Sequence, residues 1–115
     1  MFNFLNRKPS PSEITPEEIQ RCQALGEQLY IVDVREPDEY AEAHIGGSKL
    51  IPLSQLAQRT DGMPHDTPIV VVCRSGNRSS AAQSVLIRAG FAGVLNMAGG
   101  MIAWTRAGLP VKRGR

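Results

Sequence analysis

Two short runs rich in apolar, β-branched residues constrain the fold of this chain most strongly. They are Leu29–Val34 (LYIVDV) and Pro68–Cys73 (PIVVVC). Neither run alternates apolar and polar residues as a half-exposed strand does, so both predict strands that are buried on their two faces. Strands of that kind occur in parallel sheets covered by helices. Two further runs, Lys49–Ile51 and Gly93–Met97, predict shorter strands in the same sheet.

Helical segments are predicted around and between these strands. Thr15-Pro16-Glu17-Glu18 has the N-cap, the proline and the acidic residues that begin a helix, and Gly26 is a typical place for that helix to end. Four more helical segments are predicted at 37–43, 54–58, 79–89 and 98–106. The alternation of strands and helices predicts an α/β domain with a mainly parallel sheet and helices on both faces.

The chain has 115 residues, near the size of one compact domain, and 42% of them are hydrophobic. We expect this domain over residues 13–111, after a loose lead-in at 1–12 and before a solvated basic tail at 112–115. The formal charge of +2 is too small to indicate nucleic-acid binding. No stretch reaches the roughly 20 apolar residues that cross a membrane. Two cysteines and no secretory signal predict free thiols in the cytoplasm, in a monomer or weak dimer.

Cys73 is placed where a thiol can react, because it ends a buried strand and is followed by a tight loop and then a helix. Open α/β sheets bind their ligands at this edge. Successive N–H groups at a helix start attract anions, and Gly76 and Asn77 tolerate the backbone angles of a tight ring. The predicted cradle comprises Arg74, Ser75, Gly76, Asn77, Arg78 and Ser79. Such surroundings lower a thiol pKa from about 8.5 to between about 3.5 and 7.5, so we predict a nucleophilic Cys73.

Most cysteines are buried as small apolar side chains, and we interpret Cys22, on the apolar side of the first helix, in that way. Cys73 differs because two arginines and a Gly-Asn turn follow it, and these are poor core material. We therefore expect iodoacetamide to modify Cys73 faster than Cys22 near neutral pH.

The polar residues around this loop have more than one interpretation. Ser79 either donates its hydroxyl to the sulfur or caps the following helix. Asp33 ends a strand at the same sheet edge as Cys73, so it either lines the loop or braces it. Arg35 is expected to pair with Glu39, four residues on, in an ion pair that fixes the turn. We interpret His44 as a structural side chain that makes a hydrogen bond.

Three stretches of the chain resemble the rhodanese-like sulfurtransferase family. Residues Cys73–Ser79 (CRSGNRS) resemble its active-site loop. The upstream signature is similar to Asp33–Tyr40 (DVREPDEY), His44–Gly47 (HIGG) and Ile51–Leu53 (IPL). The C-terminal signature is similar to Gly99–Trp104 (GGMIAW) and Gly108–Pro110 (GLP). The resemblance spans about residues 13–111.

This resemblance implies a five-stranded parallel sheet and a two-step sulfur transfer. Cys73 would take a sulfur from a small sulfur-containing anion such as thiosulfate and hold it as a persulfide. It would then pass the outer sulfur to cyanide, a thiol or a carrier protein, with no metal or organic cofactor. The loop residues would bind chiefly through backbone N–H groups, with Arg74 and Arg78 attracting the donor and Arg78 setting donor preference. Asp33 and Arg35 would support the loop.

Two other functions remain open from the sequence. The same fold hosts cysteine phosphatases, whose loop places five residues between the cysteine and the arginine. Only four residues, Arg74–Asn77, lie between Cys73 and Arg78, and the shorter ring suits sulfur better than a phosphoryl group. The second alternative is a non-catalytic docking module, although modules of that kind usually lose the cysteine.

Overall fold

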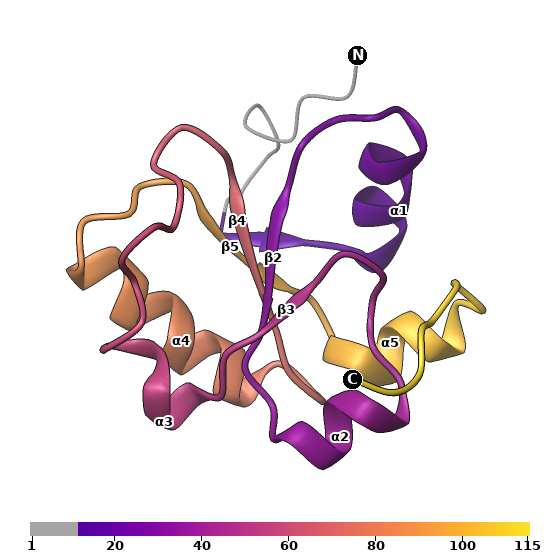
Figure 1. The fold of residues 1–115 in the computed structure, drawn as a ribbon. Helices are drawn as coiled ribbons and strands as arrows, with labels where there is room; N and C mark the ends of the chain where they lie inside the picture. The colour runs from indigo at the N-terminus through magenta and orange to yellow at the C-terminus, as the bar shows by residue number, and fades with distance from the viewer. Residues whose placement is uncertain (1–11) are drawn as a thin grey trace.

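The computed structural model describes residues 12–115, and within them five strands form one sheet (Figure 1). The strands are β1 (Glu13–Ile14), β2 (Tyr30–Asp33), β3 (Lys49–Leu50), β4 (Ile69–Val72) and β5 (Val94–Met97). They lie in the order β1-β5-β4-β2-β3, and every neighbouring pair is parallel. The predicted α/β class and the five-stranded parallel sheet are confirmed. The expected lead-in falls, apart from Ser12, outside the described residues.

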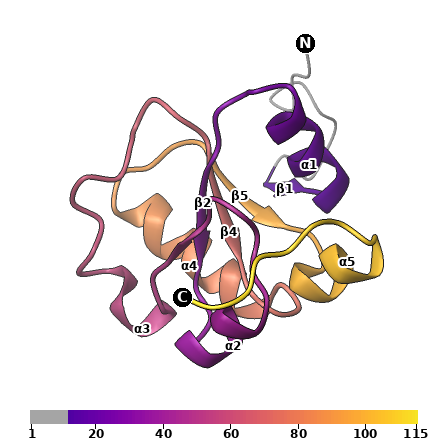
Figure 2. The same ribbon diagram turned by 45° about the vertical axis from the view of Figure 1, so that its right-hand side comes forward.

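Helices cover both faces of the sheet. They are α1 (Pro16–Ala24), α2 (Pro37–Glu42), α3 (Leu53–Leu56), α4 (Asn77–Arg88) and α5 (Gly100–Arg106). Figures 1 and 2 show α1 and α5 on one side of the sheet and α3 and α4 on the other, while α2 lies near the edge where β2 ends. Among residues 12–115, no helix is long and apolar enough to span a membrane.

The central strands supply side chains alternately to two hydrophobic cores, as the period of a strand requires. In β4, Val70 and Val72 pack toward α1 and α5, whereas Ile69 and Val71 pack toward α3 and α4. All four side chains are buried, and burying an aliphatic side chain of this size contributes roughly 1.5–3 kcal/mol. This burial on both faces explains why the run lacks polar alternation. Cys73, which follows β4, packs on the α4 side together with Ile69 and Val71.

Helix α1 starts where the sequence predicts, because Thr15 and Glu18 form a reciprocal capping box. The predicted starts of the last two helices are wrong by two residues. Helix α4 begins at Asn77 because the left-handed Gly76 (φ 111°) turns the chain directly from the loop into the helix. Helix α5 begins only at Gly100, since Ala98 still donates to Ile14 of β1, 2.9 Å away. Strand β1 itself was not predicted from the residues.

The C-terminal residues are held against α2. The backbone of Lys112 pairs with that of His44 through two hydrogen bonds of 2.9 and 2.8 Å. The guanidinium of Arg113 donates to the carbonyl of Glu42 at 2.7 Å, and the N–H of Gly114 donates to the carbonyl of Ala41 at 2.7 Å. The side chains of residues 112–115 are exposed, as the sequence predicts. Their backbone, however, is fixed rather than free in solvent.

Candidate active site

Residues Cys73–Gly76 form the loop between β4 and α4, and the start of α5 holds this loop from behind. The N–H of Met101 donates to the carbonyl of Cys73 at 2.8 Å, and that of Ile102 donates to the carbonyl of Arg74 at 3.1 Å. Gly100 has a left-handed backbone (φ +60°), and a Cβ there would overlap the carbonyl of Arg74. The second glycine of the Gly99-Gly100 pair therefore permits α5 to approach the loop this closely.

The sulfur of Cys73 is buried and surrounded by hydrogen-bond donors. The residue is 1% exposed. The N–H of Gly76 donates to Sγ at 3.0 Å, and Oγ of Ser79 lies 3.3 Å from Sγ. Burial alone would raise the pKa of the Cys73 thiol, but hydrogen bonds from the Ser79 hydroxyl and from backbone N–H groups outweigh it and lower the pKa. The sequence also predicts a lowered pKa for Cys73.

Ser79 contacts the sulfur and does not cap the helix. Its hydroxyl donates to Oδ1 of Asn96 at 2.6 Å, and it lies three residues after Gly76, which occupies the N-cap. The capping interpretation is therefore wrong. Asn96 also donates from Nδ2 to the carbonyl of Gly76 at 3.2 Å, so one buried amide of β5 joins the loop to α4.

Asn96 is a site residue that the sequence analysis missed. It is 8% exposed and is the one polar residue of the buried strand β5. In the sheet it is paired with Val71, two residues before Cys73, so it lies on the same face as the thiol. A polar residue within a buried apolar strand was the available signal, but its meaning depends on the register between β4 and β5.

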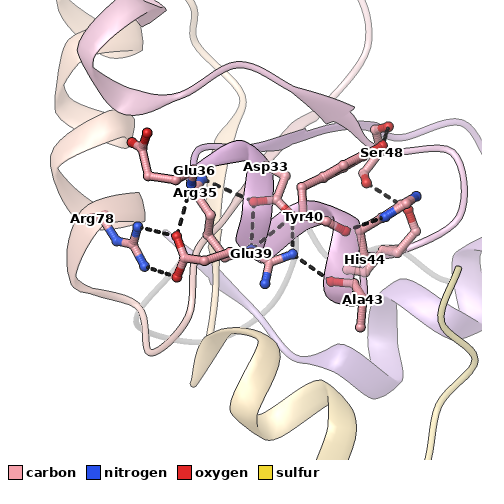
Figure 3. A network of polar contacts seen from close by, with 10 residues as sticks. Asp33, Arg35, Glu36, Glu39, Tyr40, Ala43, His44, Ser48 and Arg78 are labelled. Carbon is pink, nitrogen blue, oxygen red and sulfur yellow. Dashed lines mark hydrogen bonds and ion pairs between the residues drawn. The ribbon is translucent and has the colours of Figure 1, made fainter. Parts of the chain in front are cut away.

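Within residues 12–115, one of the two predicted loop cations is free to attract an anion and the other is paired. Arg74 is exposed and makes no ion pair within residues 12–115. Arg78 donates through both terminal nitrogens to the two carboxylate oxygens of Glu39, each at 2.8 Å (Figure 3). The hydrogen bond from Arg78 lowers the pKa of Glu39 to about 2. Glu39 is thus ionised at any ordinary assay pH.

The expected pairing of Arg35 with Glu39 is wrong. Arg35 instead forms a buried ion pair with Asp33, with Nη2 and Oδ2 2.8 Å apart. The same nitrogen donates to the carbonyl of Ala43 at 2.7 Å, and Oδ1 of Asp33 accepts from the N–H of Arg35 (Figure 3). The pair fixes the turn from β2 into α2. No hydrogen bond described for Asp33 or Arg35 reaches the loop of Cys73 within residues 12–115.

Three other residues make contacts that stabilise the fold. The ring of His44 stacks on the ring of Tyr40, with the two ring centroids 3.7 Å apart. Its Nδ1 lies 2.7 Å from the carbonyl of Tyr40. The prediction that His44 makes a structural hydrogen bond is confirmed. Trp104 is buried and donates to the carbonyl of Pro110 at 2.9 Å. Cys22 is fully buried in the core beneath α1, and burial, followed by a hydrogen bond with Glu27, raises its pKa to about 11.

A pocket of about 450 Å³ lies beside the loop, between α2 and α5. Its walls carry charged and apolar side chains, among them Glu39, Glu42, Arg74, Ile102 and Arg106. Arg74 joins the pocket to the thiol loop, since it follows Cys73 directly. The pocket can therefore hold a molecule of mixed polarity next to the loop.

Known proteins are similar to this chain in sequence. Residues 15–107 match the Rhodanese-like domain family. A sulfurtransferase of Allochromatium vinosum is 38% identical over 100 residues, which are 87% of this chain and 94% of that protein. The thiosulfate sulfurtransferase GlpE of Pseudomonas fluorescens is 42% identical over 92 residues, 79% of this chain and 82% of the relative.

Solved structures agree with the sequence relatives. The crystal structure of a rhodanese-related protein from Thermoplasma volcanium superposes with a TM-score of 0.79 at 30% identity, covering 87% of this chain and 96% of that one. The chain belongs to the rhodanese-like domain family, as its sequence motifs predict.

Proposed function

We propose that this chain is a sulfurtransferase that carries sulfur as a persulfide on Cys73. The observation that carries the proposal is the polar environment of one buried sulfur, which accepts from the N–H of Gly76 and lies 3.3 Å from the hydroxyl of Ser79. Donors placed in this way stabilise a thiolate. The similarity to proteins named sulfurtransferases supports the same class of reaction.

In the first step, the thiolate of Cys73 attacks the outer sulfur of a donor such as thiosulfate. A new S–S bond forms, and the bond between the two donor sulfurs breaks with its electron pair, so that sulfite leaves. Arg74, exposed on the pocket wall, is placed to attract an anionic donor. In the second step, a thiophilic acceptor attacks the outer persulfide sulfur and regenerates the Cys73 thiolate. Neither step needs a metal or an organic cofactor.

The acceptor is proposed to be a thiol or a protein, with cyanide as the laboratory substitute. The pocket lies at the surface between two helices, and its walls include the exposed side chains of Arg74, Arg106 and Glu42. A pocket that is open in this way, next to the loop of the buried thiol, suits an acceptor brought by a second macromolecule as well as a small thiol.

A phosphatase is less well supported. Such an enzyme needs its loop arginine to clamp a phosphate through a bidentate contact. Here Arg78 makes that contact with Glu39, so a phosphate would have to displace a carboxylate. The non-catalytic docking role is also less well supported, because the thiol and its hydrogen-bond donors are all present.

The test is the intact mass of the reduced, desalted protein after brief exposure to thiosulfate. We expect the wild type to gain one sulfur atom, and we expect the gain in Cys22→Ala but not in Cys73→Ala. Addition of cyanide should then remove the sulfur and release thiocyanate. No gain in a wild type whose Cys73 is still alkylatable would reject thiosulfate as donor. Hydrolysis of an aryl phosphate that depends on Cys73 would favour the phosphatase.

A further inference from the structure

The ion pair between Glu39 and Arg78 joins two helices that begin beside the thiol loop. Glu39 belongs to α2, and Arg78 is the second residue of α4. Besides binding both terminal nitrogens of Arg78, Oε1 of Glu39 accepts from the N–H of Glu36 at 2.9 Å (Figure 3). The carboxylate is therefore fixed in place from two directions.

This pair changes the charge that the site presents to an anion. Glu39 lines the pocket beside the loop, whereas Arg78 does not. Both carboxylate oxygens of Glu39 are turned to Arg78, so the charge of that guanidinium is already neutralised and adds little attraction for an anionic donor. The hydrogen bond with Glu39 is the main cause that raises the pKa of the Arg78 guanidinium, and the charge of the nearby Cys73 thiolate adds to it. Arg78 is therefore close enough to favour an anion at the sulfur if Glu39 were neutral.

We propose that Glu39 sets the charge selectivity of the site for its sulfur donor, by holding Arg78 in a neutral pair that disfavours doubly charged donors such as thiosulfate. The inference rests on the proposed sulfurtransferase function. Glu39 acts through Arg78 and touches neither the sulfur nor, by this proposal, the reacting atoms of the donor. It is therefore a positioning residue.

Two donors of different charge and the same chemistry can test the proposal. Thiosulfate is a dianion and benzenethiosulfonate is a monoanion. In each, the thiolate of Cys73 attacks the terminal sulfur, and the bond from that sulfur to the sulfonyl sulfur breaks with its electron pair. Sulfite leaves from the first and benzenesulfinate from the second, and both reactions leave the same persulfide anion on Cys73. The ratio of variant to wild type is therefore compared between the two donors, because their differences in size and leaving group apply to both proteins.

The variant to make is Glu39→Gln, because glutamine keeps the size of the side chain and an oxygen that can accept from the N–H of Glu36. At low ionic strength we expect a KM for thiosulfate about three- to tenfold lower than that of the wild type. The decrease for benzenethiosulfonate should be smaller, and kcat should change much less than KM for both donors. A purely structural role for Glu39 would not produce this dependence on donor charge.

Asp38→Asn is the matched control. Asp38 lies on the same helix, is exposed and forms no ion pair within the described part of the chain. Its substitution changes the net charge of the protein by the same amount, and we expect KM for both donors to remain unchanged. In an Arg78→Gln background, Glu39→Gln should give no further decrease in KM.

Three results would overturn the inference: an unchanged KM for thiosulfate in Glu39→Gln, an equal decrease for both donors, or a decrease that persists without Arg78. A readout that needs no sulfur transfer separates this failure from that of the proposed function. Glu39→Gln should raise the alkylation rate of Cys73 by iodoacetate relative to that by neutral iodoacetamide. If the wild type accepts no sulfur from either donor, the proposed function fails, and this rate ratio alone decides the role of Glu39.

Discussion

The Sγ of Cys73 and the Oγ of Ser79 lie 3.3 Å apart in a buried position. The hydroxyl of Ser79 has one proton and two neighbouring acceptors, the sulfur and Oδ1 of Asn96, which is 2.6 Å away. While Cys73 is a thiol, its S–H can donate to Ser79, and Ser79 can donate to Asn96. Once Cys73 is a thiolate, the sulfur can only accept. Ionisation of the thiol therefore brings the sulfur and Asn96 into competition for the Ser79 proton.

Replacement of Ser79 by alanine should raise the pKa of Cys73, because it removes a hydrogen bond that stabilises the thiolate. The measurement is the rate of iodoacetamide alkylation of Cys73 as a function of pH, with the profile moving to higher pH in the variant. Ser84→Ala, an exposed serine on the same helix, is the control. An identical profile in Ser79→Ala and the wild type would show that the hydroxyl does not act on the thiolate.

Gly100→Ala should distort the thiol loop, because the new Cβ would overlap the carbonyl of Arg74. Gly108→Ala is the matched control, since Gly108 also has a left-handed backbone (φ +72°) but has no atom within 4 Å of an added Cβ. The left-handed backbone alone costs about 1–2 kcal/mol in each variant. We expect a larger loss of stability in Gly100→Ala, together with altered alkylation kinetics at Cys73. Equal losses in urea unfolding would contradict the packing of α5 on the loop.

Asp33→Asn should destabilise the fold, because it leaves the buried guanidinium of Arg35 without its counterion. Breaking one half of a buried ion pair typically costs about 3–5 kcal/mol. Urea unfolding measures the loss, and exposed Asp61→Asn serves as the control. The double replacement of Asp33 and Arg35 by leucine should cost less than the single change, because no charge remains buried. A loss for Asp33→Asn within about 0.5 kcal/mol of the control, the usual range for surface substitutions, would refute the role of the pair.

The ion pair of Glu39 should stabilise the protein in a pH-dependent way. Its folded pKa of about 2 lies below the ordinary value of 4.5, so its contribution is present above pH 4.5 and is lost as the pH falls toward 2. The pair is partly exposed, which limits the contribution to about 1 kcal/mol. The difference in unfolding free energy between the wild type and Glu39→Gln should therefore be larger at pH 6 than at pH 3. The same difference at both pH values would rule out this contribution.

The parts of the fold that could be predicted are those with a local cause. The runs around β2 and β4 predict buried strands because each residue of such a strand is covered. The N-cap Thr15, followed by Pro16 and two acidic residues, predicts the start of α1. Strand β1 has two residues, which are too few for any period to be visible. Its existence depends on pairing with β5, which is more than eighty residues away along the chain.

The same distinction applies to the candidate site. The Cys73 loop is contiguous, so the thiol and its helix N-terminus could be predicted together. The ion-pair partners of the charged residues could not be predicted. A separation of four residues favours the pairing of Arg35 with Glu39. However, Asp33 is only 1% exposed, and a carboxylate buried so deeply needs a counterion. Arg35 is that counterion. Glu39 therefore pairs with Arg78, which is 39 residues away in the sequence.

The hydrogen bonds that join Lys112 to His44 and Gly114 to Ala41 have a practical consequence for anyone who handles this protein. Glu42 and Ala43, beside these anchoring points, line the pocket next to the thiol loop. An affinity tag or fluorescent protein fused after Arg115 would start close to that opening. Such a fusion would compete with large acceptors for the same space, whereas a dye attached there would report on what enters.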